Sequence, residues 1–555
     1  MKFETKLLSS LEKVFLTKLP EAKEFTEFSC LRGERFSFQL AVKYIPDESI
    51  SRSFQNTLVA DVKVDSAFES MNIYSVENVP VDQPCFANAD DYYLSKEPGL
   101  YPDALRNINT RGDSIRLPFG RWRSLWFELD VPEDMTAGKH EINITLTLAD
   151  GTEIANKTFT LEVLEAVLPQ EDFKATMWFH NDCLVNWYHV PSLSEKHWEI
   201  LSNYMANYRR YGCSMILTPI FTPPLDTWIG GERTTVQLID VTKTDGGYKF
   251  GFENLGRYID LAHKNGIKYF EIAHLFTQWG SKATPKIVTN EGERIFGWDV
   301  SATSDEYKSF VVPMLRELKA YLKEKGVLEN CYFHVSDEPT AENIDTYKAA
   351  HDIVSEELSD CHVMDALSDP RFYEEGLVRL PIASITHLQE FLDKNISPLW
   401  TYYCCGQGSQ YEANRFIAMP SARTRILGIQ LFKYNIDGFL QWGYNFWNNQ
   451  HSRNQLDPYY DTSSGFGFQS GDASIVYPLD DGTAMPSMRQ VLFYEGFQDL
   501  FALRLLEKYM NHDEIVAWLE KLSGQKVTFT DYPHGSEYLL FIREAINRKI
   551  NEFVK

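Results

Sequence analysis

The chain contains 555 residues, of which 44% are hydrophobic and 24% charged, so it has a globular composition but is too long for one ordinary core. A formal net charge of −24 argues against nucleic acid and anionic membrane surfaces as partners. No run of about 18 apolar residues occurs, so we expect no membrane-spanning segment. The first residues also lack the apolar core of a secretory signal, and we therefore predict a cytoplasmic protein.

Residues 1–168 have the pattern of an all-β domain. Apolar and polar residues alternate over 142–148, the pair Asp150–Gly151 supplies a hairpin turn, and the alternation resumes over 159–163. One-sided alternation with short turns is typical of two packed antiparallel sheets. We therefore predict that this domain is a β-sandwich.

After Pro169 apolar strands alternate with amphipathic helices, which predicts parallel β/α units. Strands are expected at 174–180, 214–220, 268–275, 331–336, 362–366, 381–385, 398–403 and 438–443. Helices are expected around 198–208 and at 256–265, 305–325, 343–358, 386–394, 420–434 and 486–509. Eight such units fit a (β/α)8 TIM-type barrel, which we assign to 169–509. The tail, 510–555, is predicted to pack on the barrel as a helix, a short strand and a helix. The expected fold class is thus multidomain, β plus α/β.

The segment 331–339 carries the strongest functional signal. A short apolar strand ends on the adjacent carboxylates Asp337 and Glu338 and is stopped by Pro339. Asp and Glu are poor strand residues, and proline cannot donate a hydrogen bond to a sheet. The strand therefore ends on residues with low strand propensity that can act as acids or bases, and such conflicts tend to mark functional sites. The ordinary alternative is an acidic turn that caps the helix expected near Asn343.

In a barrel, the chemistry lies at the carboxyl ends of the strands. Several polar and aromatic residues fall at those ends, and we predict that they bind the substrate: His180, Asn181, His274, Gln278, Trp279, Asp365, Tyr402, Tyr403, Trp442, Tyr444 and Asn445. These residues could instead have structural roles: the histidines could be hydrogen-bonded within the rim, Asp365 could cap a helix, and the aromatic rings could belong to the core.

Neither a metal nor a cofactor is expected. The first strand offers only His180 with Asp182 beside it, whereas a metal in a barrel hydrolase commonly needs clustered histidines. Eight cysteines occur without a paired CxxC spacing, which argues against a zinc ribbon, and most of them lie in apolar runs typical of reduced core thiols.

Adjacent acids suit the cleavage of a glycosidic bond, which needs a proton donor and a group that stabilises positive charge at the sugar carbon. In one route a second carboxylate, for which Asp365 is the candidate, attacks the sugar. In the other the acetamido group of the substrate attacks, Asp337 orients it and Glu338 serves the leaving oxygen. Both routes require a backbone turn, because strand periodicity sends neighbours 337 and 338 to opposite faces.

Four segments together resemble domain-of-unknown-function family 4091, which is itself similar to glycoside hydrolase family 123, the β-N-acetylgalactosaminidases. The segments are 334–339 (HVSDEP), 399–403 (LWTYY), 438–445 (GFLQWGYN) and 471–478 (GDASIVYP), and the resemblance covers roughly 170–505.

The resemblance implies a barrel that acts by substrate assistance. Asp337 would then stabilise the amide and Glu338 would be the acid/base, while Trp442 and one of Tyr402 or Tyr403 would supply an aromatic floor and a donor to the amide carbonyl.

The expected function is retaining, substrate-assisted hydrolysis of a terminal β-linked N-acetylhexosamine, with N-acetylgalactosamine as the first candidate. Two alternatives stay open: a glycosidase on a sugar without the acetamido group, and a non-catalytic glycan-binding protein. The expected partner is a carbohydrate, and the sequence does not indicate the oligomeric state.

Overall fold

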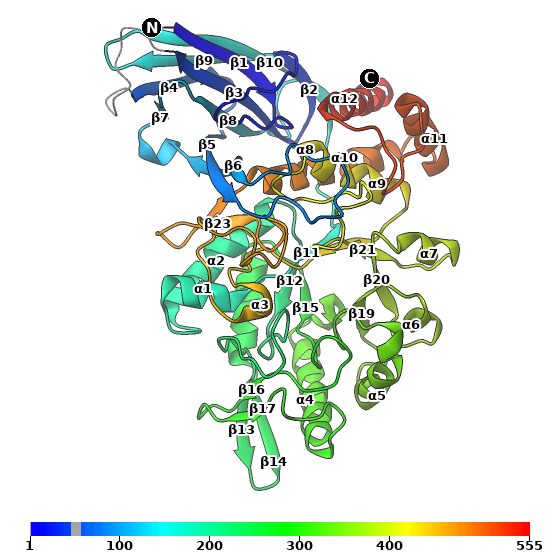
Figure 1. The fold of residues 1–555 in the computed structure, drawn as a ribbon. Helices are drawn as coiled ribbons and strands as arrows, with labels where there is room; N and C mark the ends of the chain where they lie inside the picture. The colour runs from blue at the N-terminus through cyan, green and yellow to red at the C-terminus, as the bar shows by residue number, and fades with distance from the viewer. Residues whose placement is uncertain (1, 46–56, 555) are drawn as a thin grey trace. The chain divides into compact units, whose positions relative to one another are not determined.

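The computed structural model describes residues 2–45 and 57–554, and its contacts group the chain into two compact units (Figure 1). The first unit comprises Met1–Glu171, Gly408–Asn435 and Met485–Lys555, and the second comprises Asp172–Gln407 and Ile436–Ala484. Within the described residues, no helix combines the length and the apolar character needed to cross a membrane.

Two five-stranded sheets build the first part of the first unit. One sheet has the order β1-β3-β8-β5-β6, formed by Lys2–Ser9, Arg35–Ile45, Trp122–Asp130, Met71–Val81 and Gly99–Asn107. The other has the order β2-β10-β9-β4-β7, formed by Glu27–Arg32, Glu153–Val167, Gly138–Leu148, Leu58–Ser66 and Ser114–Leu117. Their inner faces share one core, in which Phe38 stacks on Phe159 with 4.3 Å between ring centroids. The predicted β-sandwich is confirmed.

The helices of the first unit come from later in the chain. They are α8 (Ser421–Arg425), α9 (Leu427–Lys433), α10 (Met488–Leu506), α11 (His512–Ser523) and α12 (Ser536–Val554). The tail was predicted to form a helix, a strand and a helix, but its described residues form two helices. The backbone between them, 524–535, is irregular, and there the Thr528 amide donates to the Asp531 carbonyl at 2.7 Å.

Buried ion pairs hold these helices to the sandwich. Arg489 makes two hydrogen bonds of 2.8 Å to Asp103, and Arg423 makes bonds of 2.8 and 2.6 Å to Asp90. Both arginines are buried, so each needs its carboxylate to offset the loss of water.

The second unit contains an eight-stranded, nearly closed parallel barrel (green to yellow in Figure 1). The strand order is β11-β22-β21-β20-β19-β18-β15-β12, formed by Lys174–Met177, Gly438–Gln441, Trp400–Tyr402, Leu380–Ser384, His362–Leu367, Cys331–Phe333, Tyr269–Ile272 and Met215–Thr218. The Ser214 amide donates to the Ala175 carbonyl at 3.0 Å and so links the two ends of this order. The predicted barrel is confirmed, although most strands are shorter than expected.

Helices and short strands connect the barrel strands or follow the last of them. The helices are α1 (Asn181–Tyr188), α2 (Glu195–Arg210), α3 (Glu253–Lys264), α4 (Asp305–Glu324), α5 (Ile344–Val354), α6 (Arg371–Glu374) and α7 (Leu388–Asp393). The remaining strands are β13 (Asp240–Thr244), β14 (Gly247–Gly251), β16 (Ile287–Val288), β17 (Arg294–Phe296), β23 (Val476–Pro478) and β24 (Ala484–Pro486).

Candidate active site

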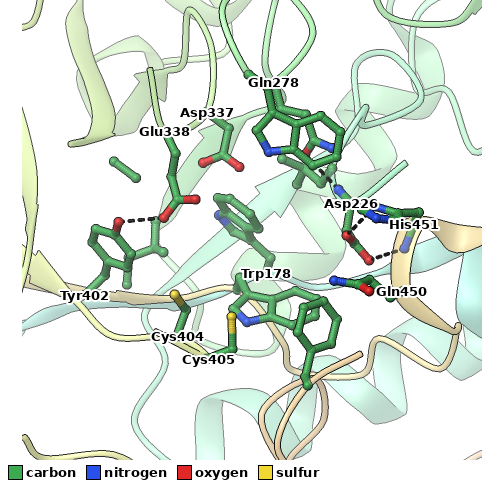
Figure 2. A pocket seen from close by; sticks show the side chains of 16 residues that line it. Trp178, Asp226, Gln278, Asp337, Glu338, Tyr402, Cys404, Cys405, Gln450 and His451 are labelled. Carbon is green, nitrogen blue, oxygen red and sulfur yellow. Dashed lines mark hydrogen bonds and ion pairs between the residues drawn. The ribbon is translucent and has the colours of Figure 1, made fainter. Parts of the chain in front are cut away.

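A cavity of about 190 Å³ opens among the segments that follow the barrel strands (Figure 2). All of its lining residues belong to the second unit. They are Trp178, Leu225, Asp226, Gln278, Trp279, Asp337, Glu338, Ala366, Tyr402, Cys404, Cys405, Leu440, Trp442, Gln450, His451 and Phe468.

Both adjacent acids line this cavity, although an extended strand would send them to opposite faces. Strand β18 ends at Phe333, and the chain then runs beside the segment after β15, where the Trp279 amide donates to the Asp337 carbonyl at 3.3 Å. Glu338 adopts a φ of +43°, in the left-handed region that side chains other than glycine rarely occupy. This strained residue ends the extended run and allows both carboxylates to face the same space.

The two acids have different surroundings. Asp337 is 8% exposed, and no side chain among the described residues donates a hydrogen bond to its carboxylate, whereas Glu338 is exposed and its Oε1 accepts a 2.6 Å bond from the Tyr402 hydroxyl. Burial raises the pKa of Asp337 well above its usual range, and the Glu338 charge raises it further. Desolvation by the cavity wall also raises the pKa of Glu338, and the Tyr402 bond opposes that rise.

A buried charge network lies next to Asp337 in the chain. His334 bridges two fully buried carboxylates, with Nε2 at 2.8 Å from Glu271 and Nδ1 at 2.8 Å from Asp365. Although burial alone would lower it, the pKa of His334 rises to about 10 because Asp365 and Glu271 hydrogen-bond and attract its charged form. The ring is therefore an imidazolium at neutral pH, and its charge favours the ionised form of Asp337.

Each carboxylate of the network has further donors. Trp178 Nε1 donates to Glu271 at 2.6 Å, and the Tyr347 hydroxyl and two backbone amides donate to Asp365. The network thus ties strands β15, β18 and β19 together beneath the acids, and it fixes Trp178 on the cavity wall.

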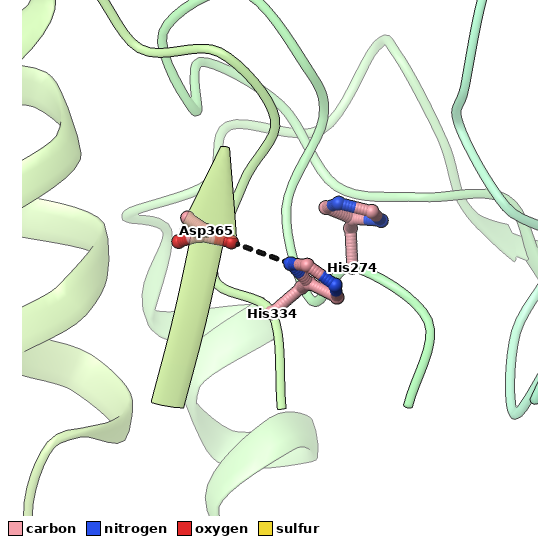
Figure 3. Close-up of side chains that lie close together, drawn as sticks. All are labelled: His274, His334 and Asp365. Carbon is pink, nitrogen blue, oxygen red and sulfur yellow. Dashed lines mark hydrogen bonds and ion pairs between the residues drawn. The ribbon is translucent and has the colours of Figure 1, made fainter. Parts of the chain in front are cut away.

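One group of side chains has the donor types of a metal site. Ring nitrogens of His274 and His334 and a carboxylate oxygen of Asp365 lie within 4.8 Å of one another (Figure 3). His274 stacks on His334 at 4.2 Å between centroids, and neither of its ring nitrogens has a hydrogen-bond partner among the described residues. Both nitrogens of His334, however, already bond carboxylates, so a metal ion on this ring would have to displace one of those two bonds.

The cavity brings together six of the predicted site residues: Gln278, Trp279, Asp337, Glu338, Tyr402 and Trp442. Trp442 packs edge-on against Phe468 at 4.9 Å, and its Nε1 donates to Asp472 at 2.9 Å. Asp472 lies in the 471–478 segment singled out from the sequence, so that segment orients a ring of the cavity.

Seven predicted residues are buried and do not line the cavity: His180, Asn181, His274, Asp365, Tyr403, Tyr444 and Asn445. His180 accepts from Arg233 at 3.0 Å and bonds the Trp442 carbonyl at 2.9 Å, while Asn445 bonds the backbone of His180. Tyr403 packs on Phe439 rather than facing the acids. These buried side chains therefore do not contact the cavity directly.

Several lining residues were not selected from the sequence, among them Trp178, Asp226, Cys404, Cys405, Gln450 and His451. Trp178 directly follows strand β11 and Cys404 closely follows β21, so strand-end position was an available signal for both. Gln450 and His451 lie in the long connection after β22, where no sequence pattern marks them.

The catalytic-domain model of glycoside hydrolase family 123 matches residues 178–506, more than half of the chain. Among solved structures, the chain is similar to a family 123 glycoside hydrolase from Clostridium perfringens whose structural analysis concerns glycolipid glycan hydrolysis. The identity is 15% and the TM-score 0.73, with 100% of this chain and 98% of that chain covered. No curated protein matches the chain.

Two other structures overlap more weakly. A β-glucuronidase from Parabacteroides merdae has 10% identity and a TM-score of 0.30, with 90% of this chain and 52% of that chain covered. An endo-β-1,4-mannanase from Thermotoga petrophila has 14% identity and a TM-score of 0.33, with 60% and 78% covered. These scores are too low to support a shared fold. The family match and the full-length fold agree with each other, and the chain therefore belongs to glycoside hydrolase family 123.

Proposed function

We propose that this glycoside hydrolase removes a terminal β-linked N-acetylhexosamine, with N-acetylgalactosamine as the first candidate, by retaining, substrate-assisted catalysis. The observation that carries the proposal is the entry of two adjacent carboxylates, Asp337 and Glu338, into one cavity. Adjacent acids suit a mechanism in which one orients a group of the substrate and the other transfers the proton.

In the proposed reaction, Asp337 accepts a hydrogen bond from the acetamido N–H and directs the amide oxygen to the sugar carbon. Glu338 protonates the departing glycosidic oxygen and then, as a base, takes a proton from the water that opens the cyclic intermediate. Trp442 and Trp178 would pack against the sugar ring, and Tyr402 would hold Glu338. An intramolecular attack of this kind is worth effective molarities of ~10⁵–10⁸ M.

The electrostatics support this division of roles. Both acids have raised pKa values and repel one another, so the pair titrates as a unit and holds a proton to higher pH than separate carboxyls would. An amide N–H that donates to Asp337 would stabilise its ionised form, and the shared proton would then reside on Glu338, where the leaving oxygen needs it.

The route through Asp365 has less support. That carboxylate is fully buried, is bonded to His334 and Tyr347, and does not line the cavity. A nucleophile must reach the sugar carbon, which Asp365 does not do in this arrangement.

We also keep a cytoplasmic location within the proposal, because all eight cysteines are free thiols.

Inhibition by a thiazoline mimic of the cyclic intermediate tests the mechanism. We expect it to bind the wild-type enzyme much more tightly than N-acetylgalactosamine does, because it resembles the bound intermediate. Asp337→Asn should lose that preference, whereas Glu342→Gln, an exposed acid nearby, should keep it. Turnover without thiazoline inhibition would point to a glycosidase with another nucleophile, and sugar binding without turnover would point to a glycan-binding protein.

A further inference from the structure

Two adjacent cysteines lie on the wall of the cavity. Cys404 and Cys405 follow strand β21, and both line the same space as Asp337 and Glu338 (Figure 2). Both cysteines are partly exposed, and neither forms a disulfide. Five of the other six cysteines are buried, so this pair is distinguished by its access to the cavity.

A turn in the backbone lets both side chains face the cavity. Neighbouring side chains of an extended strand point to opposite faces, but here the chain turns at 405–406, directly after Cys404. The Cys404 amide donates to the Gln407 side chain at 2.8 Å. The Gln469 side chain donates to the Cys405 carbonyl at 3.0 Å. Side chains from two separate segments therefore hold the backbone of the pair in this shape.

The two sulfurs lie close together. The Cys404 thiol donates a hydrogen bond to the Cys405 sulfur, and this bond, together with burial, holds the pKa of Cys404 well above its usual range. A protonated thiol is a poor nucleophile, so this arrangement does not favour a covalent role in catalysis. A neighbouring pair of thiols can, however, give up its protons to a soft metal ion, for which thiolates are the preferred ligands.

The lining of the cavity also attracts cations. It carries the carboxyl groups of Asp226, Asp337 and Glu338, and none of the lining residues that the structure describes is a lysine or an arginine. The charge of Glu338 reaches the pair, since it contributes to the raised pKa of Cys404. A cation that enters the cavity therefore meets both negative charge and two sulfur ligands.

We propose that Cys404 and Cys405 bind a soft divalent cation, such as Cd²⁺ or Zn²⁺, and that the bound ion inhibits the enzyme by excluding substrate from the cavity. Two S–H bonds break, two metal–sulfur bonds form, and two protons pass to the solvent. The cavity measures about 190 Å³, and the pair closely follows Tyr402, which bonds Glu338, so the ion would occupy space beside the acid. The inhibition rests on the proposed function, whereas the binding of the ion does not.

Titration of the full chain with Cd²⁺ tests the site. The wild-type protein should develop the ultraviolet absorption band of cadmium–thiolate bonds, and X-ray absorption by the bound cadmium should show two sulfur neighbours. Cys404→Ser and Cys405→Ser should each weaken binding by more than the ~10–100-fold that loss of a residue supporting a ligand costs, because a direct ligand is lost. Cys85→Ser, at a partly exposed cysteine of the first unit, is the matched control and should bind Cd²⁺ as the wild type does.

Cd²⁺ should also raise KM for a nitrophenyl glycoside without lowering kcat, because ion and sugar compete for one space. Bound cadmium without sulfur neighbours, or equal affinity in the wild type and both serine variants, would overturn the site. Cadmium on the sulfurs with an unchanged KM would overturn the exclusion of substrate. If no glycoside is hydrolysed, the proposed function fails and the absorption titration still decides whether the ion binds. If the serine variants do not fold, X-ray absorption on the wild-type complex decides.

Discussion

At the scale of single residues, the proposed mechanism depends on which of two neighbouring carboxyls holds a proton. Two carboxyls with raised pKa values share the cavity, and of these two the Tyr402 hydroxyl bonds Glu338. The His334 imidazolium favours the ionised form of Asp337. Small changes in these partners should therefore appear in the pH dependence of catalysis.

Replacing Tyr402 with phenylalanine tests this balance. The Tyr402 bond stabilises the Glu338 carboxylate and lowers its pKa, so its loss should raise that pKa further. Because Glu338 must be protonated to act as an acid, the alkaline limb of the profile of kcat/KM against pH should move to higher pH. Tyr403→Phe, which alters a tyrosine outside the cavity lining, is the control and should not move the limb. A limb that stays in place in Tyr402→Phe would exclude Glu338 as the titrating acid.

The charge of His334 should also make stability depend on pH. Its pKa is about 10 in the folded protein against 6.5 for the free residue, so folding binds a proton. The resulting stabilisation is complete below about pH 6.5 and is lost as pH rises to about 10, with a slope of at most ~1.4 kcal/mol per pH unit.

Urea unfolding at pH 7 and pH 9.5 measures this effect. His334→Gln should remove that slope and lower the free energy of unfolding at pH 7 by about 3–5 kcal/mol, because two buried carboxylates lose their cation. His362→Gln, at an exposed position of β19, is the matched control. Equal slopes in wild type and His334→Gln would mean that His334 is neutral.

At the scale of elements, the strand ends position the chemistry, and close backbone contacts hold them there. Gly443 lies just after β22, and a Cβ there would lie 2.4 Å from the Ala473 carbonyl oxygen. Asp472, the residue before Ala473, accepts a hydrogen bond from Trp442. Gly443→Ala should therefore destabilise the protein by about 1–3 kcal/mol and reduce activity by moving Trp442. At Gly246, in the β13–β14 turn, an added Cβ would meet open space. Gly246→Ala should therefore change neither the stability measured by denaturant unfolding nor the turnover rate. Equal stability of the two variants would contradict this account of Gly443.

The sequence predicted elements better than side-chain directions. Apolar runs between amphipathic helices located all eight barrel strands, because burial dictates those patterns locally. Strand-end position did not separate Tyr402, which faces Glu338, from Tyr403, which packs on Phe439. Asp226 and His451 were missed because only the folded loops bring together residues 225 positions apart in the chain.

At the scale of the whole molecule, three separate stretches of chain build the first unit. Removal of residues 1–171 would leave Arg489 and Arg423 without Asp103 and Asp90. The remainder should therefore aggregate or unfold at lower temperature than the full chain, as measured by light scattering and circular dichroism. Asp103→Asn should destabilise the intact protein by about 3–5 kcal/mol, and Asp65→Asn, an exposed position of β4, by little. A truncated protein with the melting temperature of the full chain would refute this dependence.

The chain is a glycoside hydrolase of family 123, and the proposed mechanism assigns a role to the acetamido group of the substrate. The most direct measurement compares kcat/KM for nitrophenyl β-N-acetylgalactosaminide with kcat/KM for nitrophenyl β-galactoside, which lacks that group. We predict a preference of ~10³-fold or more for the first substrate, since only it supplies the intramolecular attack. Comparable rates on the two substrates would contradict substrate assistance and the assignment of Asp337 to the amide.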